Sequence, residues 1–357
     1  MVGMEPGGPP PPTPPHEGEG GRCQRGAAPS PLVGEGWGGG RLARVFVLLV
    51  AVVALGACGQ PRVQELSEAG SELRLEADGL VMEDGVRLPL TVWAAEAPRA
   101  VIVAVHGFNG YANDFSLPGP WFAARGVSVY AYDQRGFGRH EAERGVWPGP
   151  ERLARDLVAA VDLVERRHGN VPVFVLGFSM GGAVALNAAT QGLGADGLVL
   201  AAPAVWGWGD MNPLYRVALW GAAHAMPAAT ATGGGLGVQV SDNIEWLRAY
   251  GRDPLNIRET RFDALFGLVD LMQEAQDAAP AARLPAFFVY GAKDEIIPEA
   301  PTMRVMASYG GDRRVAIYRS GWHMVLQDRQ RERVWRDILT WMSDPSAVLP
   351  SGEEVRP

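Results

Sequence analysis

A serine stands between two glycines at the end of an apolar run. The segment Gly177-Phe178-Ser179-Met180-Gly181 follows the predicted strand 173–176 and precedes the helix-forming stretch 183–189. Side chains at positions 177 and 181 would collide with the strand and the helix, and the tight turn lifts the serine hydroxyl out of the sheet. We predict that Ser179 is a nucleophile. The alternative is a glycine-rich turn with an incidental serine.

A serine hydroxyl reacts only when a base takes its proton. We expect His323 to be that base, because it lies just past the last predicted strand, 314–318, and before the last predicted helix. The first strand, 100–105, ends at His106, which we expect to shape its loop by hydrogen bonding. The other histidines lie in the leader, a loop, a helix end and the region between two core strands: His16, His140, His168 and His224.

A catalytic histidine needs a carboxylate to fix its tautomer. Asp294 follows the predicted strand 286–290 and is the preferred candidate, with Glu295 as the alternative. Negative charge that develops on a substrate oxygen requires N–H donors. We expect these oxyanion-hole donors to be the backbone N–H groups of Met180 and Phe108.

The elements that must position these residues alternate between strand and helix. Unbroken apolar runs are typical of parallel strands covered on both faces, and the helix beginning at Pro150 carries an apolar stripe. This alternation predicts an α/β fold with a mostly parallel central sheet and helices on both faces. The runs lie at 100–105, 127–132, 173–176, 197–201, 286–290 and 314–318.

Between residues 205 and 284 the alternation stops, and we expect an inserted helical cap on a core of residues 73–204 and 285–345. Helix-like runs lie at 213–225, 244–250 and 264–275. The cap opens with Trp206 and Trp208, which either contact substrate or form the cap's own small core.

These motifs resemble the α/β-hydrolase superfamily, in its monoacylglycerol lipase and lysophospholipase-like branch, which is grouped with the S33-type serine aminopeptidases. The resemblance covers about residues 75–343 and implies an α/β-hydrolase fold with the chain order Ser179, Asp294, His323. It also implies hydrolysis of long-chain esters under the cap, without metal or cofactor. One departure is Arg139-His140, where the family usually has serine. The residues that carry the resemblance are 106–108, 133–138, 177–181, 241–242, 250–254, 294–298 and 321–323.

The first 57 residues resemble a disordered extension followed by an export signal. Arg41 and Arg44 precede eleven apolar residues, 45–55, which is fewer than the about 20 needed to cross a membrane. The following Leu-Gly-Ala-Cys58 resembles the lipobox of bacterial lipoproteins. We therefore expect cleavage before Cys58, lipidation of its thiol, and an exported protein anchored to the periplasmic or extracellular face of a bacterial membrane.

Residues 58–72 would then form a tether, and we expect 346–357 to be a flexible tail. The chain has two cysteines, Cys23 and Cys58, and no disulfide is expected. The net charge of −8 disfavours binding to nucleic acid. The sequence favours a lipid or small-ester hydrolase over two alternatives, a peptidase or amidase with the same residues and a non-catalytic binding protein. It makes no prediction about oligomers.

Overall fold

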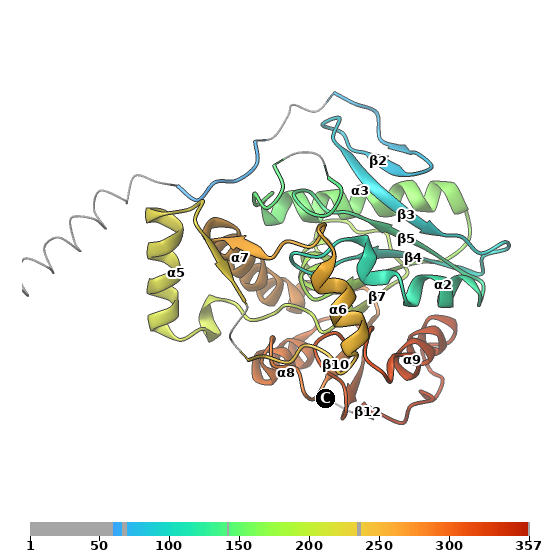
Figure 1. The fold of residues 1–357 in the computed structure, drawn as a ribbon. Coiled ribbons are helices and arrows are strands. Elements are labelled where there is room, and N and C mark those ends of the chain that lie inside the picture. The colour runs from blue at the N-terminus through green and yellow to red at the C-terminus, as the bar shows by residue number, and fades with distance from the viewer. Residues whose placement is uncertain (1–59, 66–69, 141–142, 234–236, 356–357) are drawn as a thin grey trace, which may run out of the picture. The chain divides into compact units, whose positions relative to one another are not determined.

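The computed structural model describes residues 60–65, 70–140, 143–233 and 237–355. Within these ranges one sheet has the strand order β1-β2-β3-β5-β4-β6-β7-β10-β11-β12 (Figure 1). Its six central strands, from β5 to β11, are parallel to one another, which confirms the predicted mostly parallel α/β sheet. They are β5 (Val127–Tyr132), β4 (Ala100–Val105), β6 (Val173–Phe178), β7 (Gly197–Ala201), β10 (Ala286–Gly291) and β11 (Arg313–Tyr318).

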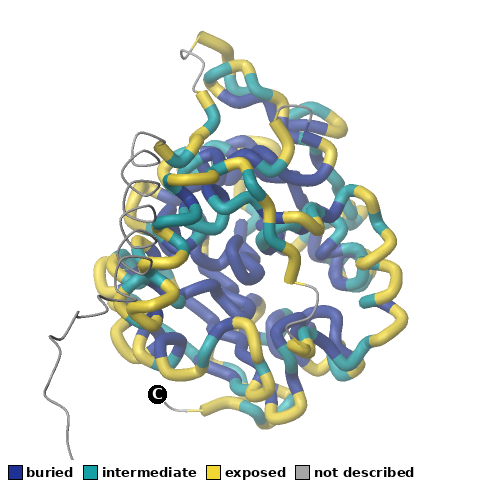
Figure 2. Tube along the Cα trace, turned by 60° about the vertical axis from the view of Figure 1, so that its left-hand side comes forward, coloured by how far each residue is buried: buried dark blue, intermediate teal, exposed yellow. Residues whose placement is uncertain are grey.

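Helices cover both faces of this sheet, so its strands are buried on both sides (Figures 1 and 2). Alternate residues of β4 enter two separate apolar clusters: Val103 faces one and Ile102 the other. The first cluster includes residues of α3 (Pro150–His168), α4 (Met180–Ala188) and α8 (Glu299–Ser308), and the second includes residues of α2 (Pro118–Ala123) and α9 (Arg331–Ser343). Burial on both faces is the reason why these strands are continuous apolar runs.

Short antiparallel strands, which the sequence analysis missed, extend both edges of the sheet. β1 (Arg74–Leu75), β2 (Gly79–Val81) and β3 (Arg87–Trp93) join β5 at one edge, and β12 (Glu354–Val355) pairs with β11 at the other. The structure corrects the expected flexible tail at 346–357. Leu349 is 2% exposed and Arg314 binds Glu354, so the described part of this segment packs on the core.

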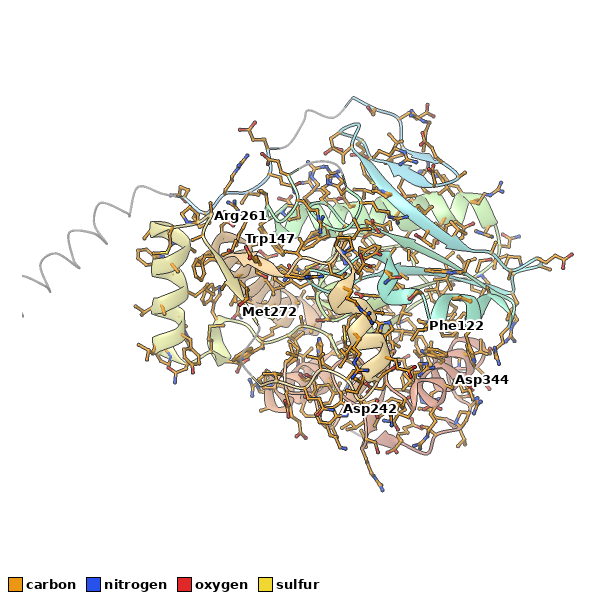
Figure 3. The ribbon with its side chains drawn as sticks, viewed as in Figure 1. Phe122, Trp147, Asp242, Arg261, Met272 and Asp344 are labelled. Carbon is orange, nitrogen blue, oxygen red and sulfur yellow. The ribbon has the colours of Figure 1, made fainter. Side chains whose placement is uncertain are left out.

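The cap elements follow β7 in the sequence and precede β10. They are α5 (Pro213–Ala225), β8 (Thr230–Thr232), α6 (Ile244–Arg252), β9 (Glu259–Arg261) and α7 (Phe262–Ala278), and β8 and β9 form a small antiparallel sheet. α7 packs against α4 and also against Trp147, so close that a Cβ atom at Gly267 would lie 2.3 Å from the indole ring (Figure 3). The cap therefore contacts the core through α7, which packs on α4, the helix that follows Ser179.

The described residues of the expected tether lie against the core. Val63 forms a β-bridge with Trp147, and the N–H groups of Gly70 and Ser71 donate to the carbonyl of Glu83. Cys58 and the leader lie outside the described residues. Within the described ranges, no helix combines the length and the apolar character that a bilayer crossing requires.

Candidate active site

Ser179 occupies a sharp turn between β6 and α4, as its flanking glycines predict. Its φ of 50° lies in the left-handed region, which a residue with a side chain adopts only when its surroundings enforce it. The Ser179 carbonyl accepts hydrogen bonds from the N–H groups of Gly182 and Ala204, each at 2.9 Å. A Cβ atom at Gly181 would lie 2.0 Å from the Val105 carbonyl oxygen. Only glycine fits there, so the turn can close tightly under the serine.

Three side chains from distant parts of the sequence meet at this turn. His323 Nε2 lies 3.0 Å from Ser179 Oγ, and His323 Nδ1 lies 2.8 Å from Asp294 Oδ2. The Asp294 side chain is fully buried, and its Oδ1 accepts the N–H groups of Ile296 and Ile297. With Nδ1–H donating to this carboxylate, Nε2 is the acceptor for the serine hydroxyl. The geometry allows His323 to take the proton of Ser179 while Asp294 orients the ring and stabilises the positive charge that the ring then carries.

The alternative carboxylate, Glu295, points elsewhere. It is exposed and accepts the N–H of Gln239 through Oε2. The structure therefore favours Asp294 over Glu295 as the partner of His323.

The remaining described histidines have other partners. His106 Nε2 accepts the Gln134 N–H at 2.9 Å, and Nδ1 donates to the Gly107 carbonyl, so His106 shapes its loop as expected. Burial lowers the pKa of His106 to about 4, which keeps this ring neutral. His168 contacts the Tyr130 hydroxyl, and His224 bonds to the Trp220 carbonyl.

The loop after β4 lies beside the nucleophile. A Cβ atom at Gly107 would be 3.4 Å from the Ser179 Cβ and 3.0 Å from the Phe178 ring, so the backbone approaches the serine closely. Within the described chain we find no hydrogen bond from the backbone N–H of Phe108 or of Met180. Neither of the two predicted oxyanion-hole donors is therefore engaged by an acceptor in the described chain.

The departure at Arg139-His140 is compatible with an ordered loop. Arg139 donates its backbone N–H to Asp133 Oδ2 and its guanidinium to both Asp133 oxygens, and the Ala112 N–H donates to Oδ1 at 3.0 Å. His140 is buried, and its Nδ1 accepts the Gly136 N–H. Arginine thus supplies donors that hold the turn after β5.

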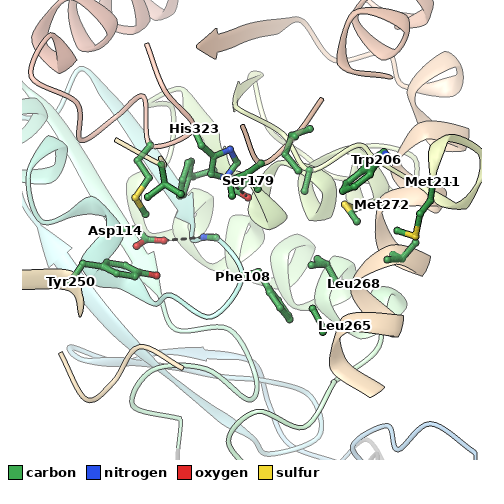
Figure 4. A pocket seen from close by; sticks show the side chains of 18 of the residues that line it. Phe108, Asp114, Ser179, Trp206, Met211, Tyr250, Leu265, Leu268, Met272 and His323 are labelled. Carbon is green, nitrogen blue, oxygen red and sulfur yellow. Dashed lines mark hydrogen bonds between the residues drawn. The ribbon is translucent and has the colours of Figure 1, made fainter. Parts of the chain in front are cut away.

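A cavity of about 450 Å³ opens onto Ser179 and His323 (Figure 4). Its walls are almost entirely apolar and combine residues of the core with residues of the cap, among them Phe108, Trp206, Met211, Leu265, Leu268 and Met272. This volume is within the range of small-molecule sites, and its lining suits a hydrocarbon chain.

The two tryptophans that open the cap have different environments. Trp206 lines the cavity, as predicted for a substrate contact. Trp208 does not: its indole N–H donates to Asp270 at 2.7 Å, and its ring packs on Phe266 beside a separate surface hollow. Trp208 lies in the short 3-10 helix η2 (Trp208–Asp210), and its contacts within the cap correspond to the second alternative, a residue of the cap's own small core.

Sequence reasoning missed two buried carboxylates near the site. Asp328 accepts the Trp322 N–H at 2.7 Å and the Ser241 hydroxyl at 2.6 Å, which ties the loop of His323 to the cap. Burial raises the pKa of Asp328 to about 6. Asp114 lines the cavity itself. Neither belongs to a local sequence pattern, although Ser241, the partner of Asp328, is among the residues that carry the family resemblance.

Comparisons with known proteins identify the family and several relatives of this chain. A model of the serine aminopeptidase S33 family matches residues 96–330. The monoacylglycerol lipase of Mycolicibacterium smegmatis is 29% identical over 266 residues, which cover 72% of this chain and 93% of that protein. The monoglyceride lipase of Rattus norvegicus is 26% identical over 276 residues, covering 75% and 91%. A soluble variant of the Saccharomyces cerevisiae monoglyceride lipase, solved with a substrate analogue, superposes with a TM-score of 0.65 at 19% identity, covering 80% and 100%.

Proposed function

Because the chain belongs to the serine aminopeptidase S33 family and has the α/β-hydrolase fold, we propose that it is a carboxylic ester hydrolase acting on lipid-like esters. The substrates would be monoacylglycerols or lysophospholipids, cleaved through an acyl-enzyme on Ser179. The observation that carries the proposal is the relay of 3.0 Å and 2.8 Å hydrogen bonds joining Ser179, His323 and Asp294 at the mouth of an apolar cavity.

In the first half-reaction, His323 Nε2 takes the hydroxyl proton while Ser179 Oγ bonds to the ester carbonyl carbon. The carbonyl oxygen becomes an oxyanion and receives the N–H groups of Met180 and Phe108. Asp294 stabilises the imidazolium through its bond to Nδ1. The C–O bond to the alcohol then breaks, and His323 returns its proton to the leaving oxygen.

The second half-reaction repeats these steps with water. His323 takes a proton from a water molecule, whose oxygen bonds to the acyl carbon and forms a second oxyanion in the same site. Collapse of this intermediate breaks the bond to Ser179 Oγ, which recovers its proton from His323. The products are a fatty acid and the free enzyme.

The long acyl chain is inferred from the cavity and from the relatives. The wall formed by Leu265, Leu268 and Met272 of α7 has no polar group for a peptide side chain to bind, and each buried methylene contributes about 0.8 kcal/mol. Monoacylglycerol or monoglyceride lipases are prominent among the relatives, which supports an ester of this kind.

A peptidase is the second candidate, because the family takes its name from serine aminopeptidases. Such an enzyme must bind a free amine near the scissile bond, which calls for carboxylates on the cap. Among the described cap residues that line the cavity, none is aspartate or glutamate. The acidic residue among the described lining residues is Asp114, which belongs to the core, so the lack of a carboxylate on the cap side supports ester hydrolysis.

The experiment is to measure hydrolysis of p-nitrophenyl butyrate, 1-monooleoylglycerol, 1-oleoyl-lysophosphatidylcholine and an aminoacyl-naphthylamide by the purified chain and by Ser179→Ala. We expect ester hydrolysis by the wild type and a loss of roughly 10⁶-fold in the variant. Circular dichroism should give matching spectra for the two proteins. Retention of more than about a hundredth of the rate by the variant, or turnover of the amide alone, would contradict the proposal.

We also propose that the protein is exported and anchored to a bacterial membrane through lipid on Cys58. Support comes from the lipobox-like sequence around that residue, which lies outside the described range. Further support is the outer surface of cap helix α5, where Leu214 and Val217 are 71% and 69% exposed. Exposed apolar side chains on a helix are suited to contact with a lipid surface.

Replacing Cys58 by serine in the full-length protein tests the anchor. The variant should move from the membrane fraction to the soluble fraction of the exported protein, and its mass should lack the lipid. Cys23→Ser serves as the matched control and should leave the distribution unchanged. Membrane retention of the Cys58→Ser protein would overturn this part of the proposal.

A further inference from the structure

The loop that carries Phe108, residues 107–111, is held from two sides. On the core side, the Gly107 N–H donates to Asp114 Oδ2 at 3.0 Å. On the cap side, this loop forms hydrogen bonds with residues 253–260, a segment that follows α6 and enters β9. One of the two predicted oxyanion-hole donors therefore lies in a loop that is bound both to the core and to the cap.

Three hydrogen bonds join the loop to this cap segment. The Ile257 N–H donates to the Asn109 carbonyl at 2.9 Å, and the Asn109 side chain donates through Nδ2 to Thr260 Oγ1 at 2.7 Å. The Tyr111 hydroxyl donates to Asp253 Oδ2 at 2.6 Å. Because Asn109 and Thr260 are 151 residues apart in the sequence, their bond forms only when the cap is seated on the core.

Two of these three bonds meet at Asn109. Its φ of 64° lies in the left-handed region, which asparagine adopts more readily than most residues that have a side chain. Its partner Thr260 is 8% exposed, so the bond between the two side chains is shielded from water. Asn109 follows Phe108 directly, and the two bonds to Asn109 therefore limit how far the neighbouring Phe108 N–H can turn.

The direction of the Phe108 N–H matters for catalysis, because an oxyanion-hole donor must already point at the place where the negative charge develops. This N–H has no acceptor in the described chain, so its direction depends on the residues on either side of it. Phe108 lines the same cavity as Ser179 (Figure 4). Among the described residues that line this cavity, neither Asn109 nor Thr260 is present. Any effect that these two residues have on the reaction must therefore pass through the loop.

We propose that Asn109 and Thr260 are positioning residues, whose hydrogen bond allows the cap to set the direction of the Phe108 N–H in the oxyanion hole. The inference rests on the proposed ester hydrolysis and gives the cap a part in the chemical step, in addition to its contacts with the acyl chain. A cap that loses this bond still encloses the substrate, but the oxyanion is then stabilised less well.

Thr260→Val tests this bond from the cap side. Valine has nearly the shape of threonine and suits a β-strand, but it lacks the hydroxyl that accepts the Asn109 amide. The bond from Ile257 to Asn109 remains, so the loop is loosened and not released. We expect kcat/KM for p-nitrophenyl octanoate to fall by about 10-fold, less than the about 10²-fold to 10³-fold loss for removal of a whole oxyanion donor. Thr260→Ser keeps a hydroxyl and should restore most of the rate.

Two inhibitors separate a misplaced oxyanion donor from a general loosening of the site. Heptyl trifluoromethyl ketone forms a tetrahedral adduct with a nucleophilic serine and places an oxyanion in the hole, whereas octyl p-nitrophenyl ether has no carbonyl oxygen. In Thr260→Val, the Ki of the ketone should rise by about 10-fold, in step with the loss of kcat/KM, and the Ki of the ether should stay unchanged. Equal weakening of both inhibitors, or an unchanged Ki for the ketone, would overturn the proposal.

Thr232→Val is the matched control. Thr232 is exposed and lies in β8, which pairs with β9, so the same substitution is made in the same small sheet. Its kcat/KM and both Ki values should equal those of the wild type. A fall in kcat/KM in Thr232→Val equal to that in Thr260→Val would refute the role of the Asn109 bond.

Asn109→Gly tests the same bond from the loop side and does not depend on the folding of Thr260→Val. Glycine accepts the left-handed φ and keeps the carbonyl that binds Ile257, but it removes the amide. The double variant should lose no more activity than either single variant, because both substitutions remove one bond. Losses that multiply, or wild-type rates in both single variants, would overturn the positioning role and leave the proposed ester hydrolysis intact. Failure of the wild type to cleave p-nitrophenyl octanoate would instead overturn both.

Discussion

Replacing Asp294 by asparagine tests the relay at its most buried member. The amide oxygen can take the place of Oδ1 and accept the N–H groups of Ile296 and Ile297, now at 2.8 and 3.0 Å from the carboxylate. The amide NH₂ then faces His323 Nδ1, where Oδ2 now accepts at 2.8 Å. A donor at that place forces Nδ1 to be an acceptor, so the ring proton moves to Nε2.

The wrong tautomer cannot take the proton of Ser179. We expect kcat to fall by about 10⁴-fold, the loss known for this substitution in serine proteases, which corresponds to roughly 5.5 kcal/mol of barrier. The assay is steady-state hydrolysis of p-nitrophenyl butyrate at pH 7.5. Circular dichroism and thermal unfolding on the same preparations would establish that the variant is folded.

Glu295→Gln is the control at the neighbouring carboxylate. Glu295 is exposed and contacts Gln239, so its substitution should change kcat by no more than about two-fold. A loss of less than 10-fold in Asp294→Asn, or a comparable loss in Glu295→Gln, would refute the assignment of Asp294.

Three further predictions concern the turn, the cavity and the buried carboxylate. Gly181→Ala should destabilise the fold by about 3 kcal/mol or more, because its Cβ would lie 2.0 Å from the Val105 carbonyl oxygen. Gly221→Ala on α5, where a Cβ atom would have no neighbour within 4 Å, should be neutral or stabilising. Equal unfolding midpoints in urea for the two variants would contradict this prediction. In the wild type, each methylene added to the acyl chain of a p-nitrophenyl ester should raise kcat/KM by up to about four-fold until the cavity is full. Leu268→Trp should fill part of the cavity, so this increase should end at a shorter acyl chain than in the wild type. Asp114 has a pKa of about 7 in the folded protein and about 3.9 in the unfolded chain, so the stability that its protonated form contributes is complete below pH 4 and is lost as the pH rises to about 7. The Tm of Asp114→Asn minus that of the wild type should therefore increase from pH 5 to pH 8. A difference that stays constant would argue against a buried, weakly solvated carboxylate.

The parts of the fold that the sequence predicts well are those that depend on local patterns. β4, β5 and β7 have the predicted bounds because each is an unbroken apolar run buried on both faces. The antiparallel edge strands were missed because they are short or interrupted: Pro89 lies inside β3, and both residues of β12 are exposed. β12 forms only because β11 offers an edge, which no local pattern records.

The same distinction applies to the site. Ser179 is identifiable because the tight turn imposes glycines on its neighbours, and His323 and Asp294 because they follow strands whose carboxyl ends meet at one edge of the sheet. Trp206 and Trp208 are equivalent in the sequence, and only the 3-10 helix η2 separates their directions. Asp114 is not predicted from the sequence, because its position depends on the packing of the 3-10 helix η1 (Ala112–Phe115) under the Gly107 loop.

The central claim is that Ser179 is the group that bonds to the substrate. The most direct measurement is to treat the purified protein with a fluorophosphonate, digest it, and locate the adduct by peptide mass spectrometry. We expect one adduct per chain, on Ser179, with loss of ester hydrolysis in proportion to labelling. Full hydrolytic activity in a protein labelled at Ser179, or inactivation with the adduct on another residue, would contradict it.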